Sequence, residues 1–484
     1  MVHLGPKEPP ARKDTLATVT GPLKDAYNEL EKQLTVDQPK LKGVVDHFVA
    51  ELEKGLSKEG GSIPMNVAWV MEYPEGTETG TYLALDMGGT NLRVAEITLD
   101  GKRNFDVVQS KYAMPRHLMT GTADEMFGFI AESIGSFMKQ YHPESNDNVH
   151  IGFTFSYPCT QSGIDHGVLQ RWTKGFDVDG VEGEDVVPML QKALDERKIN
   201  VTVGALINDT TGTLVASNYT DPLTEEGCIF GTGCNSAYYE FVRNIPKLEG
   251  KLPKDIGPDS YMAINCEYGA FDNEHKVLPR TKYDVRLDDE SPRPNQQAFE
   301  KMIAGYTLGE LLRFILQDLA GKDLMFKGQD TTNLDKSFKM DAEFLSKIET
   351  DPWENLSDTA DLFRKELNLE TTPDELEIIR RLAELLGTRA ARLSMCGVAA
   401  LYKKRGFTKA IHAGADGSVY NKYPHFRERG AQALAEIFDW EMSPEEYPIH
   451  VVPAEDGSGV GAAIIAALTK KRKEKGLSVG EIQA

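Results

Sequence analysis

Apolar residues recur at helical spacing in an early segment, and two later segments carry helix-start signals. Thr122 with Glu125, and Thr372 with Glu375, have the Thr-x-x-Glu form of a capping box ahead of apolar periodic runs. In residues 36–56 the apolar positions at helical spacing are Leu41, Val44, Val45, Phe48, Val49 and Leu52. The pattern predicts three helices, and the first is expected to turn its apolar stripe toward the core.

Short apolar runs that end in small or polar residues form a second pattern. They read YLALD, VAEITLD, HIGFTFSY, VGALIND, GCIFGTG, AIHAG and IHVVPAED. Runs of this kind between helical segments predict strands, and strands that alternate with helices predict an α/β fold. Because ligands of α/β proteins bind beyond the carboxyl ends of the strands, function is expected in the loops that follow these runs.

Composition narrows the class of protein. The chain has 484 residues, enough for two or three domains, and 54 Lys and Arg against 75 Asp and Glu give a net charge of −21. This charge argues against general attraction to nucleic acid or to an anionic membrane surface. Five cysteines without a C-x-x-C pair predict reduced thiols in a cytosol and argue against structural zinc.

The ends of the chain carry no signal for membrane insertion. Residues 1–15 are rich in proline and locally basic, which predicts a tail, and they contain no apolar stretch typical of a signal peptide. The late apolar run GVGAAIIAAL is about half as long as a bilayer requires. We therefore expect no membrane-spanning segment.

The stretch LALDMGGTNLR, residues 83–93, stops an apolar run at Asp86 and turns through Gly88 and Gly89. Two interpretations remain open for this turn. Gly-Gly is typical of a hairpin, and a second strand-like run follows. Gly-Gly also lets a backbone approach a ligand closely, because no Cβ stands in the way.

Two familiar nucleotide-binding motifs do not explain this chain. Gly-Lys occurs three times but never before Ser or Thr, which excludes a Walker-type loop. GSGVGA, from Gly457, matches a relaxed dinucleotide pattern, but only 22 residues follow Ala462. That length is too short for the second strand and acidic residue of a dinucleotide-binding unit.

Four glycine-rich strand ends remain: LDMGGTNLR, IFGTGCN, HAGADGS and AEDGSG. Their recurrence favours backbone loops around one phosphate chain, since successive N–H groups in such turns bind anions. Asp86 is then expected to hold Mg²⁺, and Thr90, Arg93 and Thr232 are expected to contact phosphate oxygens. The alternative for Asp86 is a cap at the end of a strand.

The chain resembles the fungal hexokinases nearly from end to end. The similarity rests on LGPKEPPARK, LALDMGGTNLRV, GFTFSYP, LQRWTKGFD, ALINDTTGTLVAS, FGTGCN, MAINCEYGAFDNEH, ESPRPNQQAFEKM and PAEDGSGVGAAIIAAL. The resemblance implies the actin-like ATPase (ribonuclease H-like) fold, with two α/β domains, each on a mixed five-stranded sheet, around a cleft. It also implies phosphorylation of the 6-hydroxyl of glucose, fructose or mannose with ATP and Mg²⁺.

The same resemblance implies the domain layout and the site residues. The expected layout is a tail over 1–15, N-terminal helices of the large domain over 16–74, the small domain over 75–209, the large domain over 210–457, and a returning C-terminal helix with a tail over 458–484. The expected hexose ligands are Ser156, Thr173, Lys174, Asn208, Asp209, Asn235, Glu267 and Glu300. The expected ATP-binding residues are Asp86, Gly88, Gly89, Thr90, Asn91, Arg93, Thr232, Gly417 and Ser418.

Asp209 is the expected catalytic base, assisted by Lys174 and Arg93. It ends an apolar run and precedes TTGT, so a helix is expected to begin there and to favour its ionised form. A carboxylate near the 6-hydroxyl can accept its proton as the oxygen attacks the γ-phosphorus of ATP. The alternative is that Asp209 only caps the helix. Hexose ligands on both domains imply that sugar binding closes the cleft and excludes water.

Partners and location complete the expectation. The resemblance implies a hexose substrate. The acidic charge argues against a nucleic acid or membrane partner, and the cysteines favour a cytoplasmic enzyme, with a minor nuclear pool left open. Lys7, Arg12 and Lys13 outnumber Glu8 in the tail. Two interpretations of the tail stay open: it contacts only solvent, or, as its likeness to the tails of fungal relatives implies, it docks on a second subunit and supports a weak, salt-sensitive homodimer. Two other functions stay open: a glucose sensor in glucose repression, and a sugar-insensitive ATPase or chaperone of the same fold.

Overall fold

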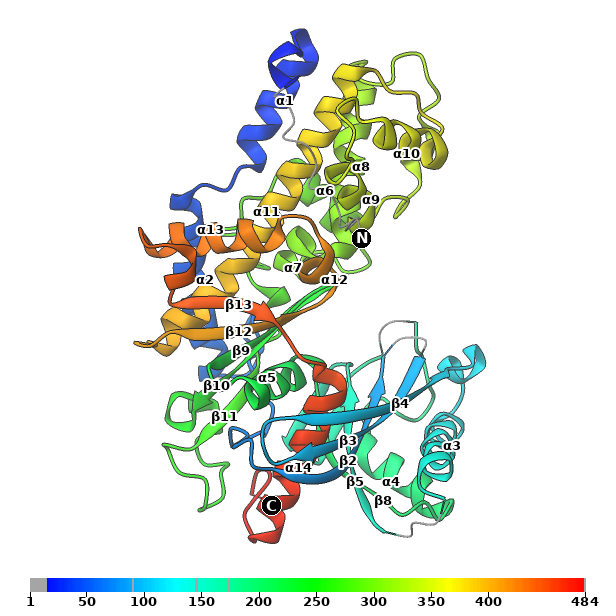
Figure 1. Cartoon of the computed structure of the whole chain (residues 1–484), viewed down its shortest axis with the longest axis vertical. Helices are drawn as coiled ribbons and strands as arrows, with labels where there is room; N and C mark the ends of the chain where they lie inside the picture. The colour runs from blue at the N-terminus through cyan, green and yellow to red at the C-terminus, as the bar shows by residue number, and fades with distance from the viewer. Residues whose placement is uncertain (1–14, 89–90, 144–146, 173–174, 483–484) are drawn as a thin grey trace, which may run out of the picture.

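Two β-sheets organise the molecule, and helices surround both (Figure 1). The computed structural model describes residues 15–88, 91–143, 147–172 and 175–482. Gly89, Thr90, Thr173 and Lys174 lie outside the described residues, as does the basic part of the tail. No helix among the described residues is long and apolar enough to cross a bilayer.

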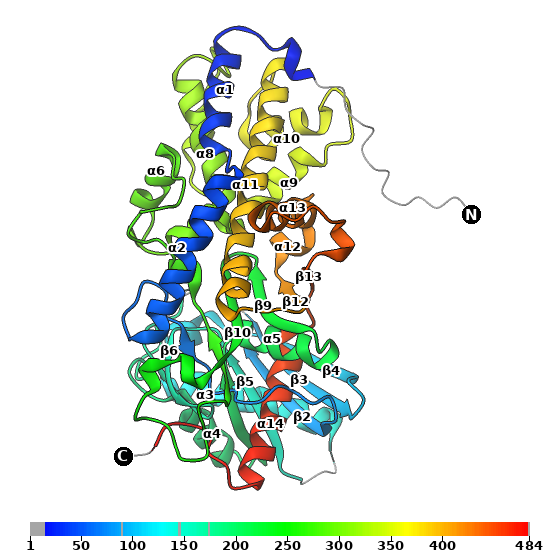
Figure 2. The same ribbon diagram turned by 90° about the vertical axis from the view of Figure 1, so that its left-hand side faces the viewer.

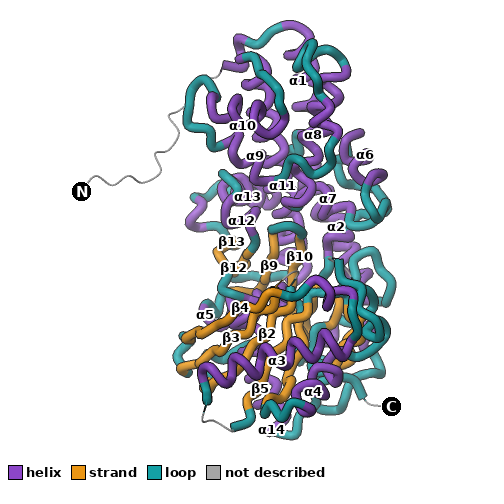
Figure 3. Tube along the Cα trace, turned by 90° about the vertical axis from the view of Figure 1, so that its right-hand side faces the viewer, coloured by secondary structure: helices purple, strands orange, loops and turns teal. Residues whose placement is uncertain are grey.

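The smaller sheet has five strands in the order β4-β3-β2-β5-β8. They are β2 (Thr79–Met87), β3 (Asn91–Asp100), β4 (Phe105–Ala113), β5 (Val149–Phe155) and β8 (Val201–Ile207). β2, β5 and β8 run parallel to one another, whereas β3 pairs antiparallel with β2, and β4 pairs antiparallel with β3. α3 (Ala123–Tyr141) and α4 (Val186–Glu196) cover one face (Figure 3), and α14 (Ala462–Glu474) packs on β2, β5 and β8.

The larger sheet has six strands in the order β1-β11-β10-β9-β12-β13. They are β1 (Asn66–Val67), β9 (Thr224–Phe230), β10 (Cys234–Phe241), β11 (Tyr261–Asn265), β12 (Ile411–Asp416) and β13 (Ile449–Pro453). The sheet is mixed, because β12 runs parallel to β9 and β13 while β10 is antiparallel to its neighbours. The expectation of two mixed α/β sheets is confirmed, and the two-residue strand β1 extends the expected five strands to six.

Helices pack around the larger sheet and form the end of the molecule that lies away from the smaller sheet (Figure 1). They are α1 (Gly21–Leu34), α2 (Gln38–Ser57), α5 (Asp209–Thr220), α6 (Lys282–Glu290), α7 (Ala298–Ile303), α8 (Gly305–Gly321), α9 (Ala342–Glu349), α10 (Ser357–Leu367), α11 (Pro373–Arg405), α12 (Ser418–Lys422) and α13 (Phe426–Phe438). The 33-residue helix α11 runs along this part of the molecule beside α2 and α8 (Figure 2). A separate hairpin, β6 (Cys159–Gly163) with β7 (His166–Leu169), follows β5.

The predicted helices and strands are present. Thr122 with Glu125 and Thr372 with Glu375 form capping boxes at the starts of α3 and α11. The apolar stripe of residues 36–56 lies on α2, where all of it except the half-buried Val49 is buried in the core. The seven apolar runs correspond to β2, β3, β5, β8, β9, β12 and β13. β2 and β3 pair antiparallel from Met87 with Leu92 onward, so the hairpin interpretation is correct.

Glycines let the backbone of α5 touch the backbone of the turn that precedes α14. α5 follows the last strand of the smaller sheet, and a π-helical turn, Gly457–Gly461, leads into α14. A Cβ on Gly212 of α5 would lie 2.1 Å from the carbonyl oxygen of Gly457, and a Cβ on Gly461 would lie 2.2 Å from that of Gly212. Only glycine permits this approach of α5 to the turn.

Candidate active site

A cleft of about 1080 Å³ is lined by residues from the ends of strands in both sheets. Ser156 follows β5, and Asn208 and Asp209 follow β8; these parallel neighbours end at the same edge of the smaller sheet. The larger sheet and its helices contribute Thr232, Asn235, Glu267, Glu300, Gly417 and Ser418. The structure therefore brings together, from both sheets, most of the described residues that the sequence singled out.

Asp209 is the first residue of α5, and Asn208 is its N-cap. The side-chain oxygen of Asn208 accepts the N–H of Thr210 at 2.8 Å. Asp209 Oδ1 accepts the same N–H at 2.8 Å and the Thr210 hydroxyl at 3.2 Å. The interpretation of Asp209 as the cap is therefore wrong, because Asn208 caps the helix. The carboxylate lies in the first turn, where the helix dipole favours its charge.

Two amides hold Glu267 in the cleft wall. Asn235 Nδ2 donates to Glu267 Oε1 at 3.0 Å, and Asn265 Nδ2 donates to the same atom at 2.8 Å. Asn235 in turn accepts the Glu267 N–H through Oδ1 at 2.9 Å. Glu267 has a left-handed backbone, with φ of 56°. Burial raises the pKa of its carboxyl, and the hydrogen bond from Asn265 opposes that shift.

Glu300 reaches the same wall from α7. Its Oε2 accepts the N–H of Cys234 at 2.9 Å, and Gln297 Nε2 lies 3.5 Å from its Oε1. A Cβ on Gly233 would lie 2.6 Å from Glu300 Oε2, so the glycine leaves room for the carboxylate. Burial raises the pKa of Glu300, which the Cys234 N–H opposes. The Cys234 thiol is buried, and burial raises its pKa well above the usual value.

Asp86 and Arg93 face each other across β2 and β3. Arg93 Nη2 lies 3.4 Å from Asp86 Oδ2 and 2.8 Å from Asp456 Oδ1, and its Nη1 contacts Asp456 Oδ2. Asp86 is the last residue but one of β2, and its carboxylate pairs with Arg93. Burial raises the pKa of Asp86, Arg93 opposes the shift, and the charge of Asp209 adds to it.

Two glycine-rich loops of the larger sheet meet at the rim of the cleft. The Gly231 N–H donates to the Gly233 oxygen at 2.9 Å, which closes the turn between β9 and β10. Gly417, with φ of 112°, follows β12, and a Cβ there would lie 2.4 Å from the Phe230 oxygen. Thr232 and Ser418 lie on these two loops. Their contact explains why glycine occupies position 417.

Sequence reasoning missed several residues of this region. Asn265 ends β11 two positions before Glu267, and this nearness in the sequence is the local signal that could have found it. Asp456, the partner of Arg93, lies 363 positions away along the chain. Arg171, Arg293 and Gln297 also line the cleft. Four of the expected ATP-binding residues lie at the β2–β3 turn and are not among the residues that line the cleft: Asp86, Gly88, Asn91 and Arg93.

Comparisons with known proteins match this chain to hexokinases over nearly its full length. Two family models, both described as hexokinase, match residues 26–219 and 225–468. A hexokinase of Kluyveromyces lactis is 58% identical, with 99% of each chain covered, and Hexokinase-2 of Saccharomyces cerevisiae is 55% identical, with both covered fully. The hexokinase of Schistosoma mansoni, solved in complex with glucose, has a TM-score of 0.81 at 34% identity and covers 92% of this chain and 100% of its own. The chain belongs to the hexokinase family.

Proposed function

We propose that this protein transfers the γ-phosphoryl group of ATP to the 6-hydroxyl of a hexose. The observation that carries the proposal is the placement of Asp209, at the start of α5, in one cleft with the carboxylates and amides of Asn235, Glu267 and Glu300. The hexokinase names of relatives at 55–58% identity favour this enzyme over the sensor and chaperone interpretations. Glucose, fructose and mannose are the proposed substrates.

Sugar hydroxyls both donate and accept hydrogen bonds, so a hexose site needs carboxylate, amide and hydroxyl partners from several directions. Asn235, Glu267 and Glu300 supply them from the side of the larger sheet, and Ser156 and Asn208 from the smaller. Thr173 and Lys174 are also proposed as hexose ligands, with Lys174 neutralising charge, but both lie outside the described residues. Partners on both sides give hexose binding a way to draw the cleft closed.

Asp209 is proposed to accept the proton of the 6-hydroxyl as that oxygen attacks the γ-phosphorus and ADP leaves. General-base assistance of this kind contributes roughly 10²–10⁴-fold to the rate. Because the site must not use water as the nucleophile, closure that expels water favours transfer to sugar over hydrolysis. Asp209 then orients the sugar oxygen rather than a solvent molecule.

ATP and Mg²⁺ are proposed to bind beside Asp86. Mg²⁺ sites on nucleotides use one or two carboxylates together with phosphate oxygens and water, and Asp86 offers one such carboxylate. A bound Mg²⁺ would neutralise phosphate charge during transfer. The phosphate chain is proposed to contact Gly88, Gly89, Thr90, Asn91, Arg93, Thr232, Gly417 and Ser418. Arg93 reaches Asp456 and Ser458 as well as Asp86, so Asp456 orients the guanidinium that phosphate would meet.

The domain boundaries, the homodimer and the location are also proposals. The strands of the smaller sheet fall between residues 79 and 207, which supports a small domain over 75–209 with α14 returning to it. A weak homodimer is proposed from the positive charge of residues 1–13. These residues lie outside the part of the chain that the structure describes. A cytoplasmic location is supported by five cysteines without a disulfide.

Asp209→Ala and Asp209→Asn test the proposed function. Each is expected to lower kcat about 10²–10⁴-fold while hexose still binds, because the base is lost and the sugar ligands remain. Asn keeps an oxygen for the Thr210 N–H, so it separates loss of the base from disturbance of α5. Product is measured as hexose 6-phosphate in a coupled assay, and sugar binding by calorimetry. Near-normal turnover of Asp209→Asn would contradict the assignment.

A further inference from the structure

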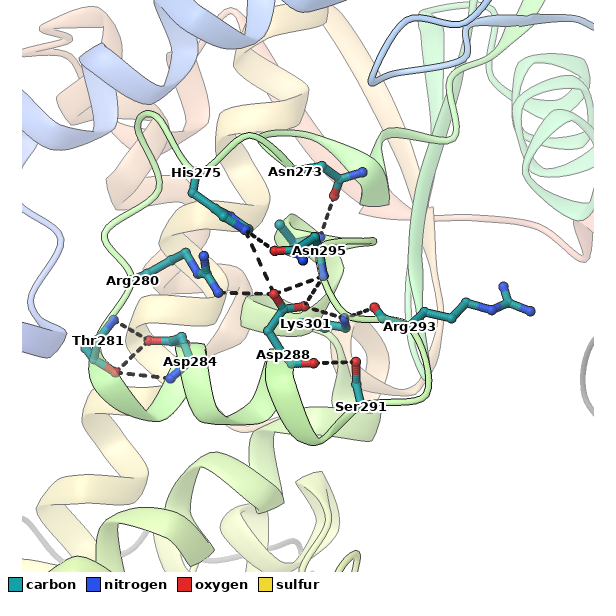
Figure 4. A network of polar contacts seen from close by, with 11 residues as sticks. Asn273, His275, Arg280, Thr281, Asp284, Asp288, Ser291, Arg293, Asn295 and Lys301 are labelled. Carbon is teal, nitrogen blue, oxygen red and sulfur yellow. Dashed lines mark hydrogen bonds and ion pairs between the residues drawn. The ribbon is translucent and has the colours of Figure 1, made fainter.

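Asp288, in the last turn of α6, lies at the centre of a polar network behind the cleft (Figure 4). Its side chain is buried, with 3% of the residue exposed. Oδ1 receives Lys301 Nζ at 2.6 Å, and Oδ2 receives Arg280 Nη2 at 3.3 Å. Both oxygens accept the N–H of Asn295 at 3.1 Å, and His275 Nε2 lies 3.9 Å from Oδ2. Asp288 lines neither the cleft nor the cavity beside it.

The network holds the segment between α6 and α7, residues 291–297. Lys301 Nζ donates to the Arg293 oxygen at 2.7 Å, and Asn273 Oδ1 accepts the Ala298 N–H at 3.0 Å. The segment passes twice through left-handed backbone at non-glycine residues, Asn295 with φ of 60° and Gln297 with φ of 55°. Such conformations persist only where surrounding contacts enforce them. Asp288 contacts the N–H of Asn295 itself, and Lys301 contacts the oxygen of Arg293 two residues earlier.

The segment and α7 together form one wall of the cleft. Arg293, Gln296 and Gln297 line both the cleft and a neighbouring cavity of about 510 Å³, and Glu300 lies between the two. α7 has only six residues, fewer than two helical turns, so its orientation depends on its contacts. Lys301 contacts Asp288, while its neighbour Glu300 accepts the Cys234 N–H on the cleft side. The ion pair therefore anchors α7 one residue away from a proposed sugar ligand.

We propose that Asp288 and Lys301 are a positioning pair for hexose specificity. The pair fixes the orientation of α7 and of residues 291–297, and so sets where Glu300 and Gln297 meet the sugar. This inference rests on the proposed function, because it takes Glu300 as a hexose ligand. Neither member touches the sugar; both act through Glu300.

The test compares sugar selectivity in Asp288→Asn, Lys301→Met and Glu300→Gln. Hexose affinity is measured by calorimetry without ATP, for the parent sugar and for its monodeoxy analogues. Glu300→Gln identifies the sugar hydroxyl that Glu300 contacts. The analogue that lacks this hydroxyl binds more weakly than the parent sugar to the wild type, but binds the variant about as well as the parent sugar does. Asp288→Asn and Lys301→Met are expected to weaken hexose binding about tenfold and to lose discrimination at that same hydroxyl, with kcat and the KM for ATP within twofold. Lys301→Arg is expected to restore affinity and selectivity.

Asp284→Asn is the matched control. Asp284 lies one turn earlier on α6, is equally buried, and pairs with Arg389 at 2.8 Å without contacting residues 291–297. Its variant is expected to lose stability but keep the selectivity of the wild type. If Asp288→Asn and Lys301→Met behave like Asp284→Asn, or lose discrimination equally at every hydroxyl, the positioning role is overturned. Wild-type protein that binds hexose without phosphorylating it would instead contradict the proposed function and leave this comparison valid.

Discussion

Gly212→Ala perturbs the backbone contact between α5 and the 457–461 turn. A Cβ at Gly212 would lie 2.1 Å from the Gly457 oxygen, 2.9 Å from its carbonyl carbon and 3.1 Å from Ile207 Cδ1. The nearest two atoms belong to backbone and cannot rotate away. An ordinary contact begins near 3.4 Å, so α5 and the turn must separate by about 1.3 Å.

Two consequences follow from that separation. Overpacking of a well-packed site costs about 1–3 kcal/mol, so we expect the free energy of unfolding to fall by that amount. Asp209 lies one turn before Gly212 on the same helix and must move with it. A misplacement of about 1 Å near the reacting groups can cost about 10²-fold in rate. We therefore expect kcat to fall roughly a hundredfold.

The measurements are a coupled assay of hexose 6-phosphate formation and denaturant unfolding followed by circular dichroism. Gly43→Ala serves as the control, because Gly43 lies in α2 with no atom within 4 Å of the added Cβ. Alanine there is expected to stabilise the helix by about 0.5–1 kcal/mol and to leave kcat unchanged. A folded Gly212→Ala protein with kcat within twofold of wild type would refute the argument that α5 carries the displacement to Asp209.

Three further outcomes are expected. Burial raises the pKa of the Glu226 carboxyl well above 4.5, and its oxygens have no hydrogen-bond partner among the described residues, so wild-type stability falls as pH rises above 4.5. Glu226→Gln should therefore need more denaturant than wild type to unfold at pH 7–8, with a difference that shrinks as pH falls toward 4.5, and a pH profile parallel to that of the wild type would contradict this. Saturating glucose should reduce the radius of gyration in small-angle scattering, and an unchanged value would exclude closure. Removing residues 1–15 should abolish a dimer seen at low salt by analytical ultracentrifugation, whereas identical sedimentation with and without the tail would remove that role.

Strands were predictable where a buried apolar run ends in a turn, and less so elsewhere. β4 is an edge strand whose side chains are mostly exposed, so its sequence FDVVQSKYA shows no buried stripe. β10 is buried but carries polar residues that find partners only in the fold. Ser236 donates to the Gly227 oxygen at 3.0 Å, and Glu240 forms ion pairs with Lys404 and Arg405. Periodicity cannot anticipate such pairings, since Lys404 lies 164 residues from Glu240.

The candidate site shows the same division between local and distant signals. Asp209 follows the apolar run VGALI, so its place at a sheet edge could be inferred from the chain alone, whereas Asn235 and Glu267 were expected only from the family resemblance. The residues that orient Arg93 and α7 come from other segments of the chain. Asp456 holds Arg93, and Asp288 anchors α7 behind Glu300. No pattern of spacing links such pairs, because burial and geometry select them after the chain has folded.

The charged side chains that line the cleft bear on where the proposed substrates would bind. Asp209, Glu267 and Glu300 line it, while Arg171 and Arg293 are the cationic side chains among the described residues that do so. Burial raises the pKa of Glu267 and of Glu300, which means that their anions are poorly solvated. A phosphate chain placed against them would add repulsion, whereas neutral sugar hydroxyls can donate to them. Under the proposed function, we infer that the phosphates lie instead toward Arg93 and the glycine-rich loops, with Asp209 at the start of α5 acting between them and the sugar.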